Sequence, residues 1–244
     1  MQPKPGIGAT LLRAWGLLCA NPLIIVPSIL LGIASAAIAT VLSQRGVLSW
    51  AFFSDMDVQG PGAFWYFFGT IVAMALRIVA AVAAIAFTAG MAAAAWRSGT
   101  AQFADGAEAF RRNGVQAALA LVLLTLVGLV AAALVVPTFG LSVLLYMIFL
   151  LYAMPAVLVG NRGAYDAIVE SVSIAWRSFG VTFVVVLLVI ALAVAGGKLG
   201  DLAAGLPFVG QLLGWVVMEA VVAYATLVVV GEYLQLGSPA DQAP

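Results

Sequence analysis

Two oppositely charged residues, Arg77 and Glu219, stand inside long apolar stretches of this sequence. If these stretches are membrane-spanning helices, Arg77 lies about thirteen residues into the second and Glu219 about eight into the sixth, so their depths differ by roughly 7 Å. The long Arg side chain can close that gap. A charge at the centre of a bilayer costs at least about 2.5–3.5 kcal/mol, so each residue needs a partner or water. We therefore predict an ion pair between Arg77 and Glu219.

This predicted pair has two interpretations. It is either a structural clamp that closes the helix bundle, or a gate or a site for a substrate or a proton. We favour the clamp, because a transport path usually contains more than one polar pair.

Other chemical groups are scarce. The chain has no histidine and one cysteine, Cys19, so the usual general base, an intrachain disulfide and a thiolate metal cluster are excluded. We expect Cys19 to be a buried apolar residue, with lipid attachment as the alternative. Because no Ser/His/Asp, Cys/His or metal-binding constellation is present, we expect no catalytic residue, no metal site and no cofactor.

The composition is that of a membrane protein. Of the 244 residues, 65% are hydrophobic and 8% are charged, against about 25% charged in soluble domains. A span needs roughly 20 apolar residues. The chain contains six candidates, and their uniformly apolar runs exclude the alternating pattern of a membrane β-barrel. We predict one all-α, polytopic transmembrane domain over residues 1–244, with spans at about 22–43, 64–96, 115–136, 141–160, 181–197 and 211–234.

Basic residues favour one side of these spans. Lys4 and Arg13 precede the first span, and Arg97, Arg111, Arg112, Arg162 and Arg177 lie in alternate loops, while the other side offers Arg45 and Lys198. The positive-inside rule then places both termini in the cytoplasm. We expect a multi-pass membrane protein surrounded by the lipid bilayer. A net charge of zero argues against a nucleic-acid partner, so the partners to expect are a membrane protein or a second copy of the chain.

Three segments on the predicted cytoplasmic side have the pattern of amphipathic helices that lie along the membrane surface, which we call elbow helices. The clearest covers 163–177, where Asp166, Glu170, Ser173 and Arg177 share a polar face and Ile168, Val172, Ala175 and Trp176 share an apolar one. The others precede the first and third spans. Each is expected to turn into the membrane, near Asn21, Asn113 or Ser178. An elbow helix followed by a two-span hairpin thus occurs three times, which suggests a threefold pseudo-repeat, although any hairpin protein with both termini inside has three such segments.

The fourth span and the segment after it carry short motifs. They are Leu151-Tyr152-Ala153-Met154-Pro155-Ala156-Val157, Asn161-Arg162-Gly163-Ala164, and then Ala167, Ser171 and Trp176. With Trp15 and Asn21-Pro22, they resemble bacterial six-helix membrane proteins known as glycerophosphoryl diester phosphodiesterase membrane domains, or related domains of unknown function. The resemblance implies a six-helix fold in the bacterial inner membrane. The group name comes from a hydrolase domain fused to some members, and we do not expect that activity here.

For function, the sequence supports three hypotheses. A non-catalytic scaffold or accessory subunit is favoured by the lack of catalytic groups and the small loops. A transporter or channel is the alternative, based on Arg77, Glu219 and the repeat, and a polar, water-filled cavity would favour it. An enzyme acting on lipid would need clustered carboxylates or hydroxyls near one leaflet, which the sequence does not indicate.

Overall fold

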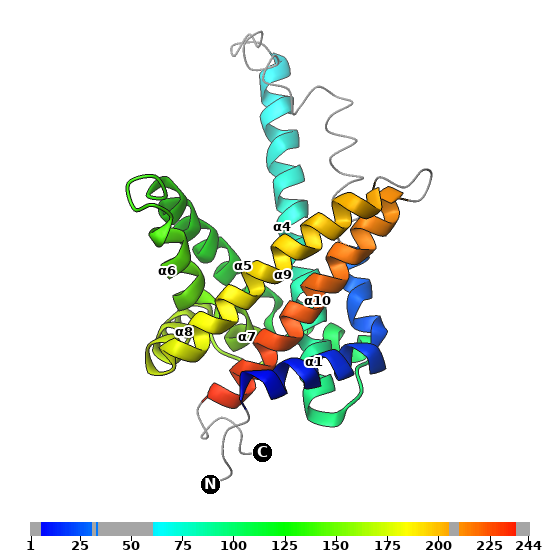
Figure 1. Ribbon diagram of the computed structural model, residues 1–244. Helices are drawn as coiled ribbons and strands as arrows, with labels where there is room; N and C mark the ends of the chain where they lie inside the picture. The colour runs from blue at the N-terminus through cyan, green and yellow to red at the C-terminus, as the bar shows by residue number, and fades with distance from the viewer. Residues whose placement is uncertain (1–5, 31–32, 34–60, 205–209, 238–244) are drawn as a thin grey trace.

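Figure 1 shows the computed structural model of the chain, which describes residues 6–30, 33, 61–204 and 210–237, with side chains except at 61–77, 204, 210–212 and 215. The described residues are helical, with no β-strand among them. The elements in chain order are α1 (Ile7–Ala20), η1 (Pro22–Ile25), α4 (Pro61–Ser98), α5 (Phe103–Ala133), α6 (Leu141–Leu150), α7 (Ala153–Leu158), α8 (Ala164–Arg177), α9 (Phe179–Ala204) and α10 (Gly210–Leu236).

Five of the described segments are long and apolar enough to cross a membrane, and a sixth is reached if the bent pair Ile7–Ala20 and Pro22–Leu30 forms one span. The predicted all-α, polytopic bundle is therefore confirmed. The predicted first span, 22–43, lies mostly outside the described residues. The others are found with shifted ends, and α4 and α9 are longer than predicted.

The predicted turns at Asn21 and Ser178 are confirmed. The axis bends by 94° between α1 and the segment Pro22–Leu30. Pro22 has no backbone N–H and disfavours helical geometry at Asn21, which has φ −130°. The elbow helix α8 likewise ends at Arg177, and Ser178, with φ −126°, separates it from α9.

The predicted turn at Asn113 is wrong. Helix α5 runs without interruption from Phe103 to Ala133, so the second elbow segment and the third span form one helix. Asn113 is followed by a glycine rather than a proline. Every residue there can still donate its backbone N–H, and a single glycine lowers helix stability by only about 1 kcal/mol.

Pro155 breaks the fourth span. The span is divided into α6 and α7 at Leu151 and Tyr152, because Pro155 cannot donate to the carbonyl four residues earlier. A tight turn precedes α6, with left-handed backbone at Phe139 (φ 51°) and Gly140 (φ 84°).

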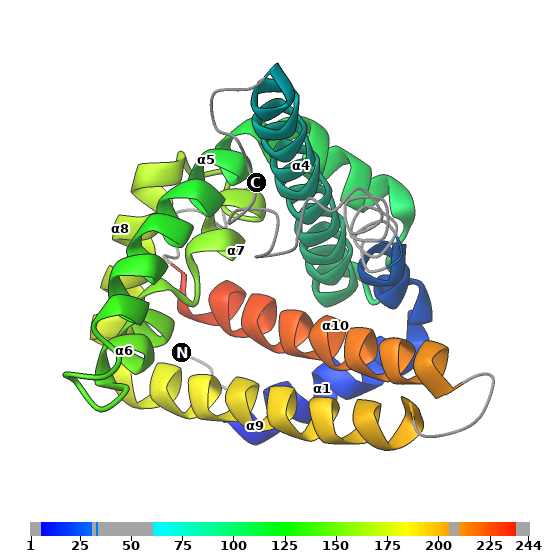
Figure 2. The same cartoon turned by 90° about the horizontal axis from the view of Figure 1, so that it is seen from above.

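The elbow helices pack in a cyclic order at the end of the bundle that holds α1, α8 and the end of α10, which we call the elbow end (Figure 1). The start of α5 packs on α4, α8 packs on α6 and α7, and α1 packs on α10. Seen from above, the hairpins α9–α10 and α5–α6 and helix α4 surround a common centre (Figure 2). The elbow segments of α5 and α8 thus each pack on the last spanning helix of the preceding unit. The first elbow helix, α1, packs on α10, the last spanning helix of the third unit.

Small residues allow these close contacts. On α4, Gly90 faces α5, where an added Cβ would lie 2.7 Å from Ala109 Cβ, and a Cβ on Gly106 would lie 2.8 Å from Phe87 Cα. Ala14, Gly106 and Ser171 stand seven residues before Asn21, Asn113 and Ser178, and all three are buried. This shared spacing agrees with the predicted pseudo-repeat.

The core is rich in alanine and valine, and most of the large apolar residues on the second half of α5 are exposed. The exposed set on α5 includes Val115, Leu119, Val122, Leu126, Val127, Leu129 and Val130. A soluble protein rarely exposes such a continuous apolar surface. These side chains form a lipid-facing surface.

Candidate functional site

The predicted ion pair between Arg77 and Glu219 stays a prediction. Arg77 belongs to helix α4, but its side chain lies outside the described residues. Glu219 lies on α10 and is half-buried.

The elbow helix α8 has three faces rather than two. Its protein-facing stripe consists of Ala164, Ala167, Ser171, Ile174 and Ala175. A second stripe is apolar yet exposed, and consists of Tyr165, Val169, Val172 and Trp176. The predicted apolar face combined members of both stripes, namely buried Ala175 with exposed Val172 and Trp176. An apolar side chain can face either the protein or lipid, and the sequence pattern does not separate the two.

The predicted polar residues of α8 separate into two groups. Asp166, Ser173 and Arg177 are exposed, and Arg177 Nε donates to the Ser173 carbonyl at 3.4 Å. Glu170 instead faces the protein. Its carboxylate forms an ion pair with Arg162 at 2.8 Å and accepts a hydrogen bond from the Tyr233 hydroxyl at 3.1 Å, which ties α8 to α10.

Trp176 is 75% exposed and stacks on Phe149 of α6, with ring centroids 6.2 Å apart. The indole thus covers the side of α6 while most of its surface is available to the membrane interface, where tryptophan is enriched. Cys19 is also exposed on α1, so the expectation that it is buried is wrong. The cysteine lies on the side of α1 away from the buried Thr10, Ala14 and Leu18.

Two asparagines connect the elbow segments to the loops of the next unit. Asn21 Nδ2 donates to the carbonyls of Leu17 and Gly99, each at 3.0 Å, and its Oδ1 accepts from the Ala101 N–H at 2.8 Å. Asn21 therefore fixes the loop between α4 and α5.

Asn113 has the corresponding position in the second unit. Its Nδ2 donates to Asn161 Oδ1 at 2.7 Å and to the Leu158 carbonyl at 3.4 Å. One turn later, Gln116 Oε1 accepts from the Ala164 N–H at the start of α8 at 3.1 Å. Asn113 and Gln116 thus fix the loop between α7 and α8, as Asn21 fixes the loop before α5.

Ser171 of α8 forms hydrogen bonds with the backbone at the break in the fourth span. Its hydroxyl donates to the Phe149 carbonyl at 2.8 Å and accepts from the Tyr152 N–H at 3.1 Å. The backbone groups exposed by the break thus obtain a partner from the elbow helix.

We expect Ser171→Ala to lower the free energy of unfolding by about 2 kcal/mol, because it leaves a buried carbonyl and a buried N–H without partners. Ser173→Ala is the matched control on the exposed face of the same helix, and should change stability by less than about 0.5 kcal/mol. Thermal unfolding of the purified proteins in detergent measures both. Equal melting temperatures for the two variants would contradict the role given to Ser171.

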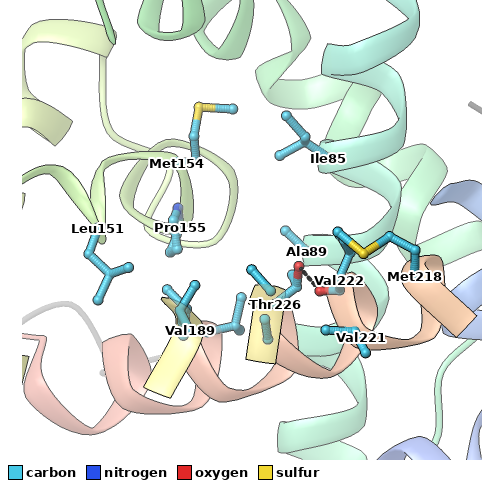
Figure 3. Close-up of a pocket in the computed structure, with 14 residues that line it drawn as sticks. Ile85, Ala89, Leu151, Met154, Pro155, Val189, Met218, Val221, Val222 and Thr226 are labelled. Carbon is cyan, nitrogen blue, oxygen red and sulfur yellow. Dashed lines mark hydrogen bonds between the residues drawn. The ribbon is translucent and has the colours of Figure 1, made fainter. Parts of the chain in front are cut away.

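A cavity of about 290 Å³ lies between α4, α7, α9 and α10 (Figure 3). Its walls are apolar and include Ile85 and Ala89 of α4, Met154 and Pro155 of α7, and Val189 of α9. Thr226 supplies a hydroxyl, but this group donates to the Val222 carbonyl at 2.9 Å. The cavity therefore differs from the polar, water-filled cavity that would favour a transporter.

The sequence interpretation missed a buried polar cluster. Tyr152, Thr182 and Glu232 are 0%, 0% and 3% exposed. The Tyr152 hydroxyl lies beside Thr182, and the charge of Glu232 acts on it. The Tyr152 hydroxyl, Thr182 Oγ1 and Glu232 Oε1 have no hydrogen-bond partner in the described part of the chain. Glu232 falls within the predicted sixth span, so the rule that selected Arg77 and Glu219 could also have selected it.

The described residues also hold no group of three or more His, Cys, Asp or Glu side chains that could bind a metal ion. Comparison with protein-family models, curated proteins and solved structures finds no match to this chain.

Proposed function

We propose that this multi-pass membrane protein is a non-catalytic scaffold or accessory subunit of the bacterial inner membrane. The observation that supports this role is how the polar side chains are used. Asn21, Asn113 and Ser171 bind backbone groups of neighbouring units, and Trp96 Nε1 donates to the Leu227 carbonyl at 2.8 Å. These contacts hold the elbow helices and spans together, while the cavity within the bundle is apolar.

In this proposal the elbow end lies on the cytoplasmic side. Arg97, Arg111 and Arg177 are exposed on the elbow segments or beside them, and basic residues are retained on the cytoplasmic side of inner membranes. Reporter fusions test this orientation. A fusion after Leu236 should be active only with a cytoplasmic reporter, and an insertion between Val136 and Phe139 only with a periplasmic one.

A membrane-protein partner, or a second copy of the chain, would contact the lipid-facing surface of α5. Photo-crosslinking in cells tests this contact, with the crosslinker at Leu126, which is 55% exposed, or at Ala120, which is 0% exposed on the same helix. We expect a discrete protein adduct from Leu126 and none from Ala120. Lipid adducts alone from Leu126 would argue against the scaffold role.

A transporter or channel that uses Arg77 and Glu219 is the second candidate. The unpartnered oxygen atoms of Tyr152, Thr182 and Glu232 within the bundle favour it. Flux measurements in proteoliposomes separate the two functions. A scaffold gives the same ion and solute flux as empty liposomes, whereas a transporter gives a flux that Glu219→Gln reduces. The resemblance to the six-helix membrane domains agrees with either role, because it implies fold and location.

A further inference from the structure

The buried cluster of Tyr152, Thr182 and Glu232 joins three separate parts of the chain. Tyr152 lies at the break between α6 and α7, Thr182 near the start of α9, and Glu232 in the last two turns of α10. All three side chains are at least nine-tenths buried, and each has an oxygen atom without a partner. Unpaired buried polar atoms are rare in native proteins, and each one normally marks a bound water, an ion or a functional group.

The neighbouring polar residues are already engaged. Tyr233 follows Glu232 in the chain, but its hydroxyl donates to Glu170. Ser171 binds the backbone at Phe149 and Tyr152 rather than the side chains of the cluster. Tyr233 and Ser171 therefore do not supply a partner to the Tyr152 hydroxyl, Thr182 Oγ1 or Glu232 Oε1.

The carboxylate of Glu232 sets the sign of the charge that the cluster can hold. Helix α6 ends at Leu150 and α7 begins at Ala153 with Tyr152 as its N-cap, so the opposite partial charges of the two helix ends offset one another at the break. An anion is disfavoured here by the Glu232 carboxylate.

The donor set selects the class of cation. Carboxylate and hydroxyl oxygens are hard ligands, which suit alkali and alkaline-earth ions better than softer transition metals. A single carboxylate balances one positive charge, and divalent Ca²⁺ sites generally use several carboxylates. We propose that Tyr152, Thr182 and Glu232 bind a monovalent alkali cation, with Na⁺ as the ion to test.

The site lies on the elbow-end side of the apolar cavity. Glu232 is three residues beyond Val229 on α10, and Thr182 is seven residues before Val189 on α9, so each shares a helix face with a cavity residue. Val185 and Val186, both fully buried, occupy the turn of α9 between Thr182 and Val189. The cation would therefore be sealed from the cavity by apolar side chains, and it would connect α7, α9 and α10 near the elbow helices.

Thermal unfolding of the full chain in detergent, in NaCl and in choline chloride of equal ionic strength, tests the proposal. Saturating Na⁺ should raise the melting temperature by about 5 °C, because an ion that binds only the folded state stabilises it. Glu232→Gln should abolish the shift. If Glu232→Gln does not fold, Thr182→Val tests the proposal instead. This variant should need about tenfold more Na⁺ to reach half of the maximal increase in melting temperature.

Two matched controls carry the same substitutions outside the cluster. Glu108→Gln removes a carboxylate that pairs with Arg111 and Arg112 on the exposed surface of α5, and Thr226→Val removes a hydroxyl that already binds the Val222 carbonyl. Both should retain the full Na⁺ response. Equal melting temperatures in the two salts for the unaltered chain would overturn the proposal, and so would a Na⁺ response that survives in Glu232→Gln or is unchanged in Thr182→Val.

Discussion

Gly231→Ala is expected to lower the free energy of unfolding by about 3–5 kcal/mol, the largest effect among the substitutions proposed for this protein. The indole of Trp96 packs directly on Gly231, and an added Cβ would overlap its six-membered ring. Moving the ring would also break the hydrogen bond from Trp96 Nε1 to the Leu227 carbonyl. The guanidinium carbon of Arg13 lies over the same indole, 4.7 Å from the ring centroid.

The control for this substitution is Gly197→Ala on α9. A Cβ at Gly197 would meet no atom within 4 Å, and alanine favours a helix over glycine by about 0.5–1 kcal/mol. Gly197→Ala should therefore equal or exceed the unaltered chain in stability. Both variants are compared by thermal unfolding in detergent and by the fraction recovered as a single species in size-exclusion chromatography. A stable Gly231→Ala protein would show that Trp96 does not pack on α10 as described.

Asn21→Ala is expected to destabilise the chain by about 2–4 kcal/mol, the second-largest effect. The substitution removes hydrogen bonds to Leu17, Gly99 and Ala101 at once. The loop between α4 and α5 would lose its attachment to the bend after α1. Hydrogen exchange should show the loss at residues 99–101 before any other described loop.

Ser98→Ala is the control for Asn21→Ala. Ser98 borders the same loop, but its hydroxyl bonds are exposed to solvent, so its removal should cost less than about 0.5 kcal/mol. Asn21→Asp should fall between the two, because it keeps the acceptor for Ala101 and loses both donated bonds. A ranking with Ser98→Ala as the most destabilised would refute the proposed attachment.

The helical class and the spans could be predicted because they depend on local properties. Apolar length marks a span wherever it occurs, and Pro155 breaks a helix by its own covalent structure. The turn at Asn113 was predicted by analogy with Asn21, although the proline that bends the chain at residue 22 has no counterpart at 114. The prediction at Asn113 was wrong because no proline follows it, and the helix end at Ser178, which Phe179 follows, shows that a break can also form where no proline predicts it.

The contacts of the candidate site could not be predicted from one sequence, because they depend on which helices are neighbours. Ser171 and Ser173 have the same chemistry, and only the packing of α8 on the broken fourth span buries the first. The approach of Tyr152, Thr182 and Glu232 likewise depends on three elements that are distant in the chain. The hydrophobic pattern places each residue on a helix but does not pair the helices.

The contact between α1 and α10 has a consequence for biosynthesis. The Tyr224 hydroxyl donates to the Leu11 carbonyl at 3.2 Å, and Gln235 Nε2 donates to Thr10 Oγ1 at 3.2 Å. Ribosomes make α1 before any other described helix and α10 after all of them, so the docking surface for α1 does not exist until α10 has been made. Leu12 and Trp15, which are exposed in the folded protein, give the nascent α1 an apolar side that can rest on the bilayer until α10 arrives.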